Sequence, residues 1–121
     1  MIKKIKKPNI DFNFPIHNDY KFYYNEENHE YYIKYKYKSK RYFNLNGKLH
    51  RIEKPAIEFY DGRKWWIENG KEHRLDGPAY IYNSYKNYWI NDKNYTKKEF
   101  AKETNHLICK LCCNFCKQTC F

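Results

Sequence analysis

The stretch Trp66-Ile-Glu-Asn-Gly-Lys-Glu-His-Arg-Leu-Asp-Gly-Pro-Ala79 decides the fold of this chain. A near copy precedes it, Phe43-Asn-Leu-Asn-Gly-Lys-Leu-His-Arg-Ile-Glu-Lys-Pro-Ala56. The Asn-Gly, His-Arg and Pro-Ala pairs recur 23 residues apart in the two copies, as Trp66-Ile67 recurs in Trp89-Ile90. A weaker copy begins at Phe22. An internal period of this length predicts a repeat protein.

Each copy has the sequence features of a β-hairpin. The aromatic run 64–68 favours a strand, and Asn69-Gly70 tolerates the positive φ that a tight hairpin turn needs. Because a single hairpin buries too little apolar surface to be stable, the units must stack. The predicted fold is mainly β, with stacked antiparallel β-hairpin repeats forming an open twisted sheet and a C-terminal capping α-helix.

This unit resembles the MORN repeat, a hairpin unit of about 23 residues with an aromatic strand, Asn-Gly-Lys, a His and a Gly-containing turn. It is similar to a divergent variant in which His-Arg-x-Asp-Gly-Pro-Ala replaces His-Gly-x-Gly, found in proteins of large DNA viruses and bacteriophages. The similarity covers residues from about 42 to 100. It implies a scaffold or binding module of viral origin, without a known active site. Lipid-headgroup roles transfer poorly, because Arg74 and Pro78 replace typical glycines.

The chain divides into three segments by composition. Residues 1–18 are expected to form an extended basic N-terminal arm, and residues 19–95 the β-hairpin repeat domain. Residues 96–121 are expected to form a C-terminal helix with a Cys-rich tail. The helix start is indicated by Thr96 and Glu99, which have the spacing of a capping box.

Two repeated His-Arg pairs, together with two tryptophans, are the candidates for a binding site on the repeat face. One interpretation stacks the pairs into a ladder that grips a phosphate or a carboxylate, since Arg presents a planar fork to such groups. The other pairs each Arg with its acidic neighbour, Glu53 or Asp76, and packs each His on a strand aromatic. Recurrence in both units makes the architectural interpretation the simpler one. The candidates are His50, Arg51, His73, Arg74, Trp66 and Trp89.

The net charge is +10, which raises affinity for polyanions. Within 31–38, Lys34, Lys36 and Lys38 alternate with apolar residues, so a strand would place them on one face. That row is the candidate polyanion-binding site. It could follow a nucleic-acid backbone beside exposed Tyr rings, or it could prevent edge-to-edge aggregation.

All five cysteines are close to the C-terminus, at Cys109, Cys112, Cys113, Cys116 and Cys120. On a helix they would form one stripe. Zinc binding is one reading, although four ligands within eight residues of one helix do not readily surround an ion tetrahedrally. Intermolecular disulfides, acylation and simple burial as small apolar side chains are the others.

The sequence contains no catalytic constellation, phosphate loop or paired carboxylates in a recognisable setting. We therefore expect no enzyme, no small-molecule substrate and no cofactor apart from zinc at the tail. No secretory signal or transmembrane run is recognisable, which predicts a cytoplasmic location, in the host cytoplasm or the virion if the protein is viral. The predicted function is a protein-binding or scaffolding module, with a protein partner or self-association. The alternative is a basic nucleic-acid-binding protein that uses the Lys rows and exposed Tyr.

Overall fold

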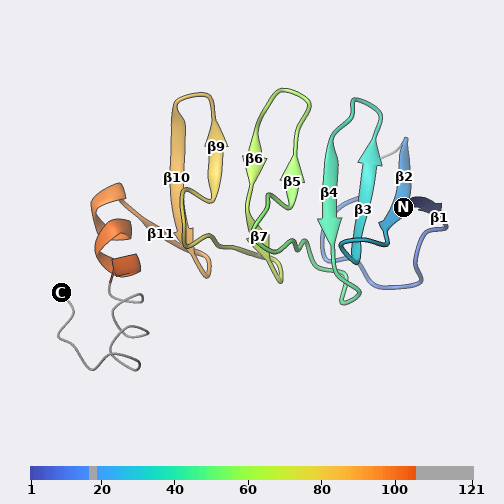
Figure 1. The fold of residues 1–121 in the computed structure, drawn as a ribbon, viewed down its shortest axis with the longest axis horizontal. Helices are drawn as coiled ribbons and strands as arrows, with labels where there is room; N and C mark the ends of the chain where they lie inside the picture. Colours follow the sequence, from blue (N-terminus) through green and yellow to red (C-terminus); the bar gives the residue numbers. More distant parts are fainter. Residues whose placement is uncertain (17–18, 106–121) are drawn as a thin grey trace.

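The computed structural model describes residues 1–16 and 19–105. Nine strands form one antiparallel sheet in the order β1-β2-β3-β4-β5-β6-β9-β10-β11, and β7 and β8 form a separate hairpin (Figure 1). This confirms the predicted mainly-β fold of stacked hairpins in an open sheet. The strands are β1 (Ile2–Ile5), β2 (Tyr20–Asn25), β3 (Glu30–Tyr35), β4 (Lys40–Phe43), β5 (Ile57–Glu58), β6 (Lys64–Trp65), β7 (Ile67–Glu68), β8 (Lys71–Glu72), β9 (Tyr80–Tyr82), β10 (Tyr85–Ile90) and β11 (Lys93–Tyr95).

The hairpins β3–β4, β5–β6 and β9–β10 stand side by side, and their loops all lie at the same end of the strands (Figure 1). The connections between the hairpins run along the other end of the strands, where the β7–β8 hairpin also lies (Figure 1). This hairpin falls between β6 and β9 in the chain but does not belong to the main sheet. β6 therefore pairs directly with β9. Each unit therefore contacts the next through neighbouring strands, as in other repeat architectures.

The N-terminal segment takes part in the sheet and in its core. β1 pairs antiparallel with β2, from Ile2 opposite Asn25 to Ile5 opposite Phe22. The sheet therefore begins before residue 19, the expected start of the repeat domain. A four-residue strand of two isoleucines and two lysines, without period-two alternation, gives a weak sequence signal, although lysines are common on edge strands such as this one.

Within the N-terminal segment 1–18, residues 10–16 cover one face of β2–β4, and from here on "the arm" means these seven residues. The Phe12 ring lies 5.4 Å from Phe14, 5.9 Å from Phe22 and 5.2 Å from Phe43, measured between ring centroids. The arm is fixed to the edge of the sheet, because the Asn13 N–H donates to the Gly47 carbonyl at 2.8 Å. The buried residues of this core are Phe14, Phe22, Ile33 and Phe43.

The predicted Asn-Gly turn has the expected backbone. Asn69 and Gly70 have φ values of 50° and 78° and connect β7 to β8. Positive φ at both loop residues is the geometry that matches the twist of two paired strands. Asn91 and Asp92 form the same kind of turn in the third copy, with φ values of 47° and 66°.

The third copy is one residue out of phase with the second. The loop of β5–β6 has three residues between Phe59 and Arg63, whereas that of β9–β10 has only two, Asn83 and Ser84. In consequence Ala56 donates its N–H to the Trp65 carbonyl, but Ala79 donates to the Asn87 carbonyl. Asn87 is thus the equivalent of Trp65. The residue after Asn87, Tyr88, therefore occupies the position of Trp66, where the 23-residue period predicts Trp89.

The C-terminal helix is described over residues 97–105 and lies at the end of the sheet opposite β1 (Figure 1). The predicted capping box is present: Thr96 N–H donates to the Glu99 carboxylate at 2.9 Å, and Glu99 N–H donates to the Thr96 hydroxyl at 3.1 Å. Phe100 is buried against Tyr88, with ring centroids 4.8 Å apart. In the described ranges, no helix has the length and apolar character needed to cross a membrane.

Candidate functional site

The two repeated histidines join each unit to the turn of the next. The His50 N–H donates to the Tyr42 carbonyl at 3.0 Å, and His50 Nδ1 accepts the Asn69 N–H at 2.9 Å. The His73 N–H donates to the Trp66 carbonyl at 3.1 Å, and its Nδ1 accepts the Asn91 N–H, also at 3.1 Å. In both cases the side chain satisfies a backbone donor of a tight turn, which would otherwise lack an acceptor.

Arg51 lies flat on an aromatic ring and is held by two carboxylates. Its guanidinium carbon is 3.7 Å from the Tyr42 ring centroid. Its Nε donates to Glu30 at 2.8 Å, and its Nη1 donates to Glu58 at 3.3 Å. The expected partner Glu53 is exposed and is not among the carboxylates paired with Arg51. The acidic partners come from β3 and β5, which sequence proximity could not reveal.

Arg74 repeats this arrangement with a different acid. Its guanidinium carbon lies 3.8 Å from the Trp66 ring centroid, and its Nε donates to the expected partner, Asp76, at 2.9 Å. Its Nη1 donates to the Pro78 carbonyl at 3.1 Å, just as Arg51 Nη1 donates to the Pro55 carbonyl at 3.2 Å. The aromatic rings of the first two units are thus covered by guanidinium groups.

The His-Arg pairs are therefore engaged in contacts within the sheet. Both guanidinium groups stack on rings and donate to carboxylates of this chain, so the geometry favours the architectural interpretation over a ladder for external anions. The two tryptophans do not form a common site. Trp66 is buried under Arg74. Because of the one-residue shift in the third copy, Trp89 occupies the position of Ile67 instead.

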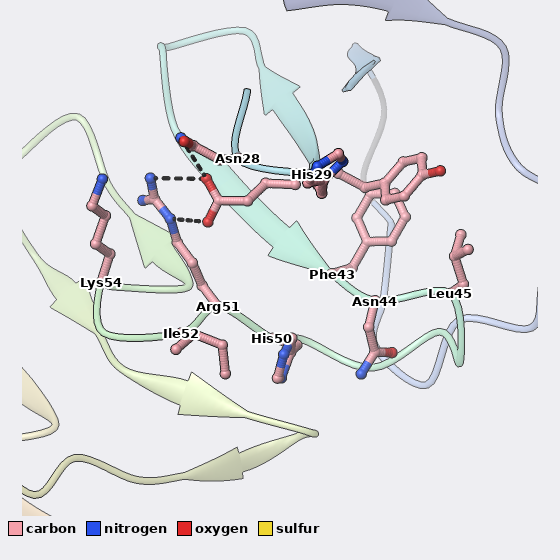
Figure 2. A pocket seen from close by; sticks show the side chains of 11 residues that line it. Asn28, His29, Phe43, Asn44, Leu45, His50, Arg51, Ile52 and Lys54 are labelled. Atoms are coloured by element: carbon pink, nitrogen blue, oxygen red, sulfur yellow. Dashed lines mark hydrogen bonds and ion pairs between the residues drawn. The ribbon is translucent and has the colours of Figure 1, made fainter. Parts of the chain in front are cut away.

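A hollow of about 560 Å³ lies beside Arg51, between the β2–β3 turn and the connection that follows β4 (Figure 2). His29 and His50 line it, but the carboxylate of Glu30 balances the charge of Arg51 there (Figure 2).

Burial raises the pKa of the neighbouring Tyr42 to about 12, against a smaller lowering by the charge of Arg51. Among the described residues, no three His, Cys, Asp or Glu side chains are grouped to hold a metal ion.

The predicted row of Lys34, Lys36 and Lys38 does not exist as a row on one strand. β3 ends at Tyr35, and Lys36 and Lys38 lie in the loop before β4. Lys38 has a φ of 62°, the conformation of Gly62 in the equivalent loop. The alternation of Tyr and Lys continues through this turn without a Gly, Asn or Pro to mark it, so the sequence pattern overstated the strand. The five cysteines lie outside the described residues.

Sequence reasoning did not identify an aromatic patch on the second half of the sheet. Phe59 and Trp65 have ring centroids 5.4 Å apart, Trp65 and Tyr80 are 4.3 Å apart, and Tyr80 and Tyr85 are 6.1 Å apart. We call these four residues the aromatic patch. Only the strand register shows that they share a face, because they come from two different hairpins.

The aromatic patch continues the face that the arm covers. Directly opposed residues share a face, and the register runs from Ile33 to Arg41, Ile57, Trp65 and Tyr80. Ile33 belongs to the core beneath the arm, whereas Tyr85 is 61% exposed. The arm thus covers this face at β2–β4, whereas in the aromatic patch Tyr85 is exposed and the other three rings are half-buried.

No protein-family profile, curated protein sequence or solved structure matches this chain.

Proposed function

We propose that this protein is a non-enzymatic, MORN-like repeat scaffold of viral origin that binds a protein partner through the aromatic patch. The observation that carries the proposal is the incomplete cover of one face: the arm shields it at β2–β4, whereas in the aromatic patch Tyr85 is exposed and the other three rings are half-buried. Exposed aromatic clusters of this kind are typical of protein-binding surfaces. The proposal places the protein in the host cytoplasm or in the virion.

The arm indicates what kind of segment this face accepts. Its apolar residues alternate with other residues, and all of them pack on this face: Ile10, Phe12, Phe14 and Ile16. A backbone hydrogen bond from Asn13 to Gly47 fixes its position. The partner we propose is an extended segment with alternating apolar residues, which would cover Trp65 and Tyr80 as the arm covers Phe43.

The repeated connections supply the rigidity that a scaffold needs. Arg51 N–H donates to the Ile67 carbonyl at 3.0 Å, and Arg74 N–H donates to the Trp89 carbonyl at 3.1 Å. Together with the two histidines, these bonds fix each hairpin against the next. The aromatic residues of successive units are therefore held in fixed positions before any partner binds, which lowers the ordering cost of binding.

The test is site-specific photo-crosslinking in the cells that make the protein. A benzoyl-phenylalanine at position 80 reports on the patch, and one at position 71, an exposed residue of β8, serves as the control. We expect a partner to be crosslinked from position 80 only. The purified partner must then bind the wild-type protein and must lose at least about tenfold in affinity for Trp65→Lys, a loss of about 1.4 kcal/mol. Equal crosslinking from both positions, or unchanged affinity for Trp65→Lys, would refute the proposal.

A further inference from the structure

The strand register creates a row of lysines across the sheet that no single strand contains. Lys21 on β2 lies directly opposite Lys34 on β3, which lies opposite Lys40 on β4. The row continues through Glu58, Lys64, Ile81 and Lys86, each opposite the one before. We call the five lysines the cross-strand row: Lys21, Lys34, Lys40, Lys64 and Lys86.

The cross-strand row lies on the face opposite the arm and the aromatic patch. Side chains alternate between faces along a strand, so Lys21 and Lys34 point away from the face that holds Phe22 and Ile33. The ammonium of Lys40 lies 5.3 Å from the centroid of the Tyr32 ring, which belongs to this opposite face. From β2 to β10 the row crosses seven neighbouring strands, a length of roughly 29 Å at about 4.8 Å per strand spacing.

The positive charge of the row is not balanced within the described part of the chain. None of its five ammonium groups is in an ion pair there. Glu58, the one carboxylate in the row, already accepts a hydrogen bond from Arg51 at 3.3 Å. Like charges directly opposite one another destabilise a sheet, and Lys21, Lys34 and Lys40 form two such pairs in succession.

Protection against edge-to-edge aggregation does not account for this arrangement. Lysines serve that purpose on edge strands, but Lys34, Lys40 and Lys64 each lie opposite a residue of a neighbouring strand on both sides. An anionic ligand on this face would relieve the repulsion among the row lysines. The row therefore has the properties of a binding surface for a linear polyanion.

Exposed tyrosines lie next to the row, in the hairpin loops. Tyr37 is 66% exposed and Tyr60 is 69% exposed, and their ring centroids are 5.9 Å apart. Tyr37 belongs to the loop between Lys34 and Lys40, and Tyr60 to the loop that precedes Lys64. Both rings offer an accessible aromatic surface within a few residues of the row.

We propose that the cross-strand row and the two loop tyrosines bind single-stranded nucleic acid that lies across the strands. The row is one lysine wide, so it matches one phosphodiester backbone, and unpaired bases stack on exposed aromatic rings. A duplex would hide its bases from Tyr37 and Tyr60. This surface is separate from the aromatic patch, which lies on the other face, so either proposal can fail while the other holds.

The test is binding of the full-length, reduced protein to a fluorescein-labelled oligo(dT) strand and to a labelled duplex across a salt series. We expect the single strand to bind more tightly than the duplex. In the triple variant Lys34→Ser/Lys40→Ser/Lys64→Ser we expect at least a tenfold loss at low salt. The slope of log K against log[salt] should fall by about 2, because a single strand contributes about 0.7 per phosphate contact.

Two control variants separate this surface from general basic charge. Lys48→Ser/Lys54→Ser/Lys71→Ser removes the same charge from exposed positions outside the row and should change affinity less than threefold. Tyr37→Leu/Tyr60→Leu should reduce single-strand affinity about tenfold while leaving the salt slope unchanged, because stacking releases no counterions. Circular dichroism establishes that each variant is folded.

Several outcomes would overturn the proposal. Equal losses in the two lysine triples would show that net charge alone attracts the oligonucleotide. Tighter binding to the duplex would exclude stacking of unpaired bases. Absence of binding at low salt, or binding only to phosphatidylserine vesicles in a row-dependent manner, would assign the row to solubility or to a membrane surface.

Discussion

The two ends of the sheet are built from similar hairpins but stabilised in different ways. At β1–β4 the arm adds a second layer and completes an apolar core around Ile33, which is fully buried. At β5–β11 the buried apolar cluster is smaller, with Ala56, Ile57 and Ile67, and the units are also held by backbone hydrogen bonds, histidine side chains and stacked arginines.

This difference shows how a thin sheet can remain ordered with only a small apolar core. The Asn69-Gly70 and Asn91-Asp92 turns have their backbone donors satisfied by the preceding unit, and one ring in each unit is covered by a neighbouring side chain. The cover is Arg51 on Tyr42, Arg74 on Trp66 and Phe100 on Tyr88. The last member is apolar, which suits the end of the stack, where the helix replaces a further hairpin.

The largest expected effect concerns the contact between the arm and the first repeat. A Cβ on Gly47 would lie 1.7 Å from the Asp11 carbonyl oxygen, whereas one on Gly70 would have no heavy atom closer than 3.5 Å. Their φ values are nearly equal, at 77° and 78°. We expect Gly47→Val to lower the free energy of unfolding by about 4 kcal/mol and Gly70→Val by about 2 kcal/mol. Urea unfolding measures both, and equal losses would contradict the close arm contact.

The next effect compares aromatic residues of the same face. Phe14 is 9% exposed in the arm core, whereas Trp65 is half-buried in the open patch. We expect Phe14→Ala to cost about 3 kcal/mol and Trp65→Ala roughly 1.5 kcal/mol, measured by thermal or urea unfolding. If Trp65→Ala costs as much as Phe14→Ala, the second half is covered as well as the first.

A smaller difference is expected between the two stacked arginines. The Arg51 side chain is 10% exposed and its partner Glu30 is 19% exposed, whereas Asp76 beside Arg74 is 82% exposed. Removing Arg51 leaves a shielded carboxylate without its partner, so we expect Arg51→Met to cost about 2 kcal/mol and Arg74→Met about 1 kcal/mol. Urea titrations at low and high salt measure this. Identical costs would mean that ring stacking alone determines both.

The smallest effect is a pH dependence that originates from Tyr42 in β4. Burial raises the pKa of Tyr42 from 10 to about 12 in the folded protein. The unfolded chain therefore loses this proton first, so the contribution is intact below pH 10 and is lost as pH rises from 10 to 12. Between pH 9 and pH 11, the free energy of unfolding should therefore fall by roughly 1 kcal/mol more in the wild type than in Tyr42→Phe. Parallel pH profiles for the two proteins would contradict the shift.

The fold could be predicted from the sequence because its turns and period are local signals. Asn69-Gly70 and the Thr96–Glu99 spacing each specify a backbone geometry within four residues, and both were confirmed. The site could not be predicted in the same way. The Glu30 partner of Arg51, the aromatic patch and the cross-strand row depend on which residues of different strands lie opposite one another. A loop shortened by one residue also moved Tyr88 into the position expected for Trp89.

The strictly sequential strand order has a consequence for how the chain folds. Every strand of the sheet pairs with its nearest neighbours in sequence, apart from the step over the β7–β8 hairpin. Low contact order of this kind is associated with rapid folding, even in an all-β protein. Because the arm-covered end holds the apolar core, we expect folding to nucleate there and to extend hairpin by hairpin toward the helix. A repeat inserted between β6 and β9 would lengthen this process without rerouting the chain.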